Sequence, residues 1–123
     1  MDITPLIPKD RQIINRYGDG GFVINGVAHK GNILIGPEGV APWPVASLGD
    51  VTPDSLAFLL AGALPEIVLA GAGMHGLPLP PALRAHFRDK GIAIDVMDTG
   101  AACRTYTVLL AEGRLVAAAL IAV

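Results

Sequence analysis

The hydrophobic pattern of the chain changes near residue 52, and the two halves predict different elements. Between residues 11 and 36, short β-rich runs alternate with glycine-containing turns, and Asn25-Gly26 is a strong hairpin signal. We therefore expect two or three antiparallel strands in this half. Residues 1–10 hold two prolines and show no hydrophobic period, so they predict a loose N-terminal arm.

In the second half, uninterrupted apolar runs alternate with helical patterns. Residues 79–91 predict a helix that has proline near its start and glycine at its end. Thr52-Pro53 marks another helix start, with Thr52 as the N-cap, and Gly62 would end that helix. Strands are predicted at residues 66–73, 92–98 and 114–123.

Strands that are apolar throughout are typical of parallel strands buried on both faces. With helices between them, they predict an α/β fold in three layers, which is a central mixed and largely parallel sheet with helices on both faces. The first half would add an antiparallel β extension at the N-terminal side. No repeat, linker or low-complexity segment divides the chain, so we expect a single domain over residues 1–123.

Residues 99–113 fit two patterns. Their β-branched content suggests a hairpin that turns at Glu112-Gly113. A helix is suggested by Thr99 as a possible N-cap, by the alanines that follow, and by a stop at Gly113. A helix would also supply the crossover that a parallel final strand requires, and we favour it.

The chain has one cysteine, Cys103, followed directly by Arg104. If residues 99–112 form a helix, Cys103 lies in or just beyond its first turn, where the helix dipole and an arginine would favour a thiolate. The alternative is that Cys103 is a small buried side chain on the packing stripe of the helix. Both interpretations remain open from the sequence.

A candidate ligand pocket is formed by two loops at predicted strand ends, residues 71–76 and 98–104. Carboxyl ends of neighbouring parallel strands meet at one edge of a sheet, where ligands of open α/β sheets bind. A helix N-terminus there would suit an anion. The alternative is that the glycines of the first loop only permit a tight turn. The candidate residues are Gly71, Gly73, His75, Asp98, Thr99, Gly100, Cys103 and Arg104.

The segment 37–51 is too rich in proline and glycine to predict a regular element. Trp43 lies there between two prolines and is a candidate for contact with a protein partner, because tryptophan is enriched at the centres of interfaces. The alternative is that Trp43 folds back and covers the sheet, since tryptophan is usually well buried.

Composition and charge narrow the classes of partner. The 123 residues are 52% hydrophobic and carry a formal charge of −2 without a cluster of lysine and arginine, so we expect no nucleic-acid partner. Proline or charged residues interrupt the most apolar runs, so we expect no membrane-spanning helix. The N-terminus lacks the apolar stretch of a signal peptide, and one cysteine fits a reducing compartment, so we expect a cytoplasmic protein.

The sequence holds no motif for common cofactor or metal chemistry. Its glycines do not match GxGxxG, and it lacks a Walker-type GK[ST], CxxC, HExxH or GxSxG. Asp95 and Asp98 would lie on opposite faces of a strand and would not form a catalytic carboxylate pair. We therefore expect no cofactor and no metal.

The stretches MDTGAACRTY (97–106) and IVLAGAGMHGLPLP (67–80) resemble a small family of single-domain proteins of unknown function. The eukaryotic relatives in this family include a mitochondrial protein, assembly factor three of respiratory complex I (NADH:ubiquinone oxidoreductase). The resemblance implies a three-layer α/β fold, a helix at 99–112, no established catalytic residue, and a protein–protein role in assembling a membrane complex.

Two functions follow from these observations. The first is a non-catalytic interaction domain that helps a membrane-associated complex to assemble. The alternative is a small enzyme or anion-binding protein that uses the crevice at residues 71–76 and 98–104. The apolar composition would also tolerate a homo-oligomer.

Overall fold

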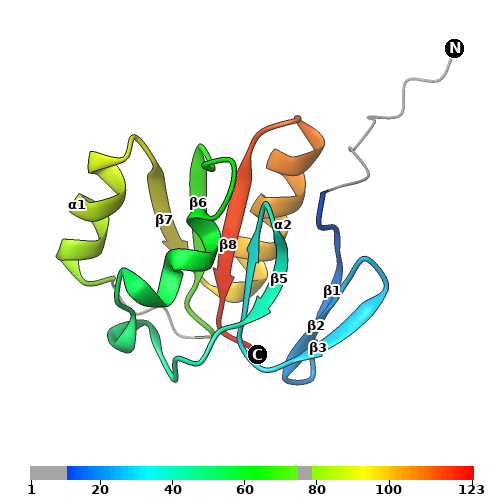
Figure 1. The fold of residues 1–123 in the computed structure, drawn as a ribbon. Coiled ribbons are helices and arrows are strands. Elements are labelled where there is room, and N and C mark those ends of the chain that lie inside the picture. Colours follow the sequence, from blue (N-terminus) through cyan, green and yellow to red (C-terminus); the bar gives the residue numbers. More distant parts are fainter. Residues whose placement is uncertain (1–10, 75–78) are drawn as a thin grey trace, which may run out of the picture.

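The computed structural model describes residues 11–74 and 79–123, which build two β-sheets and four helical segments (Figure 1). The smaller sheet is antiparallel, in the order β1-β2-β3, with β1 at Ile14–Gly18, β2 at Gly21–Ile24 and β3 at Val27–Lys30. The turn between β2 and β3 has positive φ at Asn25 (49°) and Gly26 (79°), as a two-residue hairpin turn requires. The predicted antiparallel extension is confirmed.

The larger sheet has five strands in the order β5-β4-β8-β6-β7. β6 pairs in parallel with β7 and β8, whereas β4 pairs antiparallel with β5 and β8. The sheet is mixed, as predicted, but it is not largely parallel. The strands are β4 (Ile33–Gly36), β5 (Gly39–Pro42), β6 (Ile67–Gly71), β7 (Ala93–Met97) and β8 (Val116–Leu120).

β4 and β5 account for the difference from the prediction. β4 belongs to the larger sheet, although the pattern of the first half had suggested one continuous antiparallel extension. β5 lies inside the segment for which no regular element was expected. It forms because residues 36 and 39 close a tight hairpin with β4, and its final proline sits at an edge strand, where a missing N–H is tolerated.

The helices are α1 (Pro81–Asp89), α2 (Thr99–Ala111) and the 3₁₀ segments η1 (Leu48–Asp50) and η2 (Asp54–Leu60). Because α2 is a helix, the helical pattern for residues 99–113 is confirmed and the hairpin is wrong. The helix after Pro53 is 3₁₀ rather than α, a difference that the hydrophobic pattern does not resolve because both types bring i and i+3 together. The 3₁₀ segment begins at Asp54 with Pro53 as its N-cap, one residue later than expected. The Oγ1 atom of Thr52 still accepts a hydrogen bond from the backbone N–H of Ser55 (3.2 Å).

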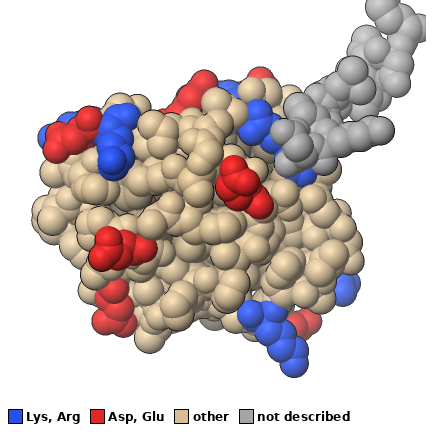
Figure 2. All heavy atoms as spheres, in the orientation of Figure 1, with Lys and Arg blue, Asp and Glu red and all other residues tan. Residues whose placement is uncertain are grey.

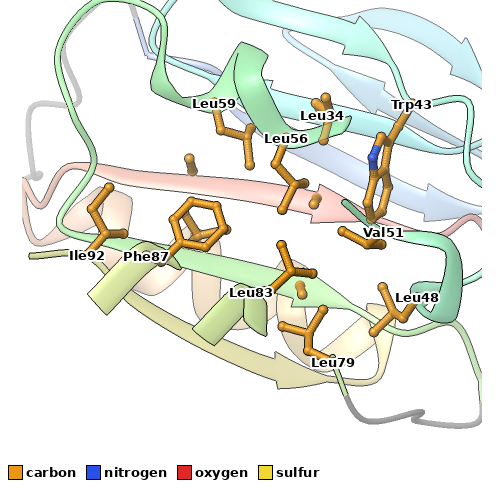
Figure 3. Close-up of a cluster of buried hydrophobic side chains, with 14 residues drawn as sticks. Leu34, Trp43, Leu48, Val51, Leu56, Leu59, Leu79, Leu83, Phe87 and Ile92 are labelled. Carbon is orange, nitrogen blue, oxygen red and sulfur yellow. The ribbon is translucent and has the colours of Figure 1, made fainter. Parts of the chain in front are cut away.

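Two hydrophobic clusters draw alternate residues from the same strands. The α1-side cluster includes Val68 and Ala70 of β6 and side chains from α1, η1 and η2, and in Figure 3 those of η2 and α1 point toward one another. The α2-side cluster includes Leu69 of β6, Phe22 of β2 and Tyr106 of α2. Because both sets of alternate positions are buried, β6 and β8 are apolar throughout.

Candidate functional site

Thr99 occupies the centre of the predicted pocket. Its side chain is fully buried, and its Oγ1 donates a hydrogen bond to the Ile121 carbonyl (2.6 Å) and accepts one from the Gly73 N–H (2.9 Å). Its backbone N–H donates to the Gly73 carbonyl (3.0 Å). Thr99 therefore joins the loop after β6 to the segment after β8.

Local structure requires glycine at two positions at the end of β6 and in the loop that follows it. A Cβ at Gly71 would lie 2.9 Å from Cδ2 of Leu120 and 3.0 Å from Oγ1 of Thr99, so only glycine allows this close approach. Gly73 has a φ of +82°, the left-handed conformation that glycine adopts without strain. The space beside Gly71 is thus taken by protein side chains, in agreement with the tight-turn alternative.

The N-terminus of α2 is capped by Asp98, which the sequence also allowed as a capping residue, and not by Thr99. Oδ1 of Asp98 accepts a hydrogen bond from the Ala101 N–H (2.8 Å), and its carbonyl accepts one from the Ala102 N–H (2.9 Å). Thr99 is the first helical residue because its hydroxyl serves the loops instead. An anion at this helix end would meet a carboxylate that already uses the favourable end of the helix dipole.

Cys103 is buried in the α2-side cluster, with 3% of its surface exposed. Burial raises the pKa of its thiol from the ordinary 9.0 to about 11, an effect that the positive charge of Arg104 only partly offsets. The thiol is therefore protonated at neutral pH, and only a thiolate is a strong nucleophile. The geometry agrees with Cys103 as a packing residue.

Arg104 reaches the small sheet. Its Nη1 atom donates a hydrogen bond to the Tyr17 hydroxyl (3.1 Å). Both groups lie over Gly100, where an added Cβ would come within 2.8 Å of the Tyr17 oxygen. The structure thus brings Gly71, Gly73 and Thr99 together, whereas Arg104 contacts β1. His75 lies outside the described residues.

Trp43 is buried, with 3% of its surface exposed, and its ring belongs to the α1-side cluster (Figure 3). Its backbone N–H donates to the carbonyl of Asn32 (2.9 Å), which holds the residue beside β4. The ring therefore covers the sheet, the alternative considered from the sequence, and does not present a contact surface to a partner.

A groove that the sequence did not predict lies between β1 and α2. It has a volume of about 570 Å³, and we call it the β1–α2 groove. Its formation depends on the packing of two elements that are far apart in the chain, so no local pattern marks it. Eight residues line it: Ile14, Asn15, Arg16, Tyr17, Cys103, Arg104, Thr107 and Val108.

The charges on the face shown in Figure 2 are of both signs and scattered. Over residues 11–74 and 79–123, no helix has both the length and the apolar character needed to cross a membrane. In the same ranges, no three side chains of histidine, cysteine, aspartate or glutamate converge as metal ligands would.

The fold and these contacts define a small mixed α/β domain whose most distinctive polar residues hold its own loops together. The chain belongs to the family described as "Protein of unknown function (DUF498/DUF598)", whose model matches residues 14–121. The family resemblance noted in the sequence is confirmed.

Relatives and solved structures agree with this assignment. The chain is 37% identical over 109 residues to the protein named "NADH dehydrogenase [ubiquinone] 1 alpha subcomplex assembly factor 3" from Xenopus tropicalis, covering 88% of this chain and 60% of that one. It is 39% identical to an uncharacterized Rhodobacter capsulatus protein, covering 88% of this chain and 82% of the relative. A crystal structure of a Bordetella parapertussis protein superposes with a TM-score of 0.83 at 37% identity, covering 94% and 100% of the two chains.

Proposed function

We propose that this chain assists the assembly of a respiratory NADH dehydrogenase, complex I, by binding protein partners, and that it catalyses no reaction of its own. The observation that carries the proposal is the 37% identity to an animal assembly factor over 88% of the chain. Because the chain spans 60% of that relative, the proposal concerns the role of the domain that the two proteins share.

The contacts of the motif residues account for these residues without a catalytic role. Asp98 caps α2, Thr99 joins two loops, and Cys103 packs in the α2-side cluster. Each of these side chains has a role in folding that accounts for its presence. The anion-binding alternative gains no support from these contacts, since Asp98 and Gly73 already bind N–H groups of the first turn of α2.

The proposal is tested by deleting the gene in the source organism, provided that the organism makes complex I. We expect less fully assembled complex on a native gel and less NADH:ubiquinone activity in membranes, both restored by the full-length chain. An unchanged amount of assembled complex in the deletion strain would contradict the proposal.

The claim that the chain catalyses no reaction has a separate test. A Cys103→Ala chain that is folded, as shown by circular dichroism and a thermal melt, should restore assembly as well as the unmodified chain. A folded Cys103→Ala chain that fails to restore assembly would point to thiol chemistry. The cytoplasmic location expected from the sequence stays a prediction.

A further inference from the structure

The β1–α2 groove has one wall made by a strand and one made by a helix. Its strand wall contributes residues 14–17, and its helix wall contributes four residues of α2 between positions 103 and 108. Extended peptides add about 3.3 Å per residue, so the five residues of β1 would accompany four or five residues of a bound segment. The groove thus has the form that extended peptides use when they add a strand to a sheet.

β1 offers backbone groups for such an addition. In the described part of the chain, β1 pairs with β2 alone and forms one edge of the small sheet. An edge strand presents a row of N–H and C=O groups that no neighbouring strand uses. Hydrogen bonds to these groups would supply affinity without requiring a particular sequence.

The side chains of the groove indicate the chemistry of a peptide that could bind there. Val108 and Tyr17 expose 56% and 39% of their surfaces, so the groove offers apolar contact. Among the described residues that line it, the charged ones are Arg16 and Arg104, and none is acidic. Arg104 is held in place by the Tyr17 hydroxyl, which leaves its other N–H groups to bind a carboxylate.

We propose that the β1–α2 groove binds an extended, apolar peptide segment with a carboxylate group, supplied by a partner protein, as an additional strand next to β1. The inference rests on the proposed protein-binding function and names the surface and the partner chemistry for it. The carboxylate is either an acidic side chain inside the segment or the carboxyl terminus of the partner.

A second copy of the chain fits this groove less well. A two-fold interface places the same surface patch of both copies face to face. Pairing of β1 with β1 would bring the arginines at positions 16 and 104 of both copies close together, with no acidic side chain among the described groove residues to offset their charge. Charge complementarity therefore favours a different protein.

The test uses the full chain and displayed libraries of random peptides of about eight residues, in one format with a free carboxyl terminus and in another as an internal segment. Peptides that the chain enriches are then synthesised and titrated into the ¹⁵N-labelled chain. We expect enrichment of apolar residues together with aspartate or glutamate, or with the free terminus. The amide signals that shift should belong to β1 and to residues 103–108.

Val108→Glu and Val27→Glu form a matched pair of variants. The two valines expose 56% and 57% of their surfaces, but Val27 lies on β3 and does not line the groove. Val108→Glu places a negative charge beside the bound carboxylate and should weaken binding of the selected peptide about tenfold or more. Val27→Glu should leave the dissociation constant unchanged.

Several outcomes would overturn the inference. They are the absence of enriched peptides, enriched peptides without a carboxylate, shifts confined to other surfaces, or equal binding by both variants. Sedimentation that shows a dimer abolished by Val108→Glu would assign the groove to a second copy instead.

The groove inference and the proposed assembly role can fail independently of each other. If Val108→Glu restores complex I assembly in the deletion strain as well as Val27→Glu does, the groove is not the docking surface, although the assembly role stands. If deletion has no effect on assembly but the peptides bind the groove, the assembly role fails and the groove inference stands.

Discussion

The loops at the carboxyl ends of β6 and β7 and the β1–α2 groove differ in how their polar groups are used. In the loops, the Thr99 hydroxyl both donates and accepts hydrogen bonds within the protein, and Asp98 caps α2. In the groove, an edge strand and two arginines face solvent. The polar groups of the loops are thus used within the fold, whereas the groove leaves one strand edge and its charged side chains exposed, among them Arg104 of the same motif.

Thr99→Val should give the largest effect on the loops. Valine has nearly the same shape but leaves the Gly73 N–H and the Ile121 carbonyl without their side-chain partner, and the loss should be about 2–4 kcal/mol of the free energy of unfolding. Urea denaturation measures it. Thr107→Val is the control, because Thr107 is exposed and bonds only within its own helix, to the Cys103 carbonyl. Equal losses in the two variants would contradict the role given to Thr99.

Gly71→Ala should have the next largest effect. The new Cβ would lie 2.9 Å from Leu120 and 3.1 Å from the Cα of Thr99, and overpacking of this kind costs about 1–3 kcal/mol. Gly49→Ala is the matched control, because its Cβ would meet only Ser47 Oγ at 3.7 Å. A thermal melt in which both variants behave like the unmodified chain would show that the loop after β6 has spare room.

The stability of the chain should depend on Cys103 at alkaline pH. The folded thiol has a pKa of about 11 and the unfolded thiol one near the ordinary 9.0, so the unfolded chain loses its proton first as the pH rises. The contribution is fully present below pH 9 and is lost between about pH 9 and 11, which amounts to about 1–2 kcal/mol.

A comparison of the unmodified chain with Cys103→Ala at pH 8 and pH 10.5 measures this loss as a difference in urea midpoints. Burial also raises the pKa of the Tyr106 hydroxyl, but Tyr106 is present in both proteins and its effect cancels. If both proteins lose stability equally between the two pH values, the Cys103 thiol is accessible in the folded chain and Cys103 is not a packing residue.

Val108→Glu should have the smallest effect on folding. The side chain is 56% exposed, so the free energy of unfolding should change by less than about 0.5 kcal/mol, as for Val27→Glu. Urea denaturation of the two variants is the check. A large loss for Val108→Glu alone would mean that the groove contributes to the core and is not a free surface.

Elements defined by local chemistry were predictable from the sequence. The Asn25-Gly26 turn follows from the preference of these residues for positive φ. For α2, the start and stop signals favoured a helix, and the need for a crossover to the final strand added to them. β5 was missed because its short, glycine- and proline-containing segment becomes a strand only through pairing with β4. The formation of β5 therefore depends on its pairing with β4 and not on the strand propensity of its own residues.

The candidate site was less predictable than the fold. The pattern correctly placed residues 71–73 and 98–99 at neighbouring strand ends, since β6 and β7 are parallel. It could not show that the Thr99 hydroxyl would bind a backbone group 22 residues away at Ile121. The groove brings together Tyr17 and Arg104, which lie 87 residues apart in the chain. No local sequence pattern can therefore predict it.

The position of β8 affects how the chain folds during synthesis. β8 is the last strand in the sequence, yet it lies at the centre of the larger sheet, between β4 and β6. The β4–β5 hairpin and the β6–β7 pair therefore leave the ribosome with inner edges that await the same strand. A nascent chain that stalls before residue 116 exposes two sheet edges to other proteins, so the synthesis of β8 is the step that closes this sheet.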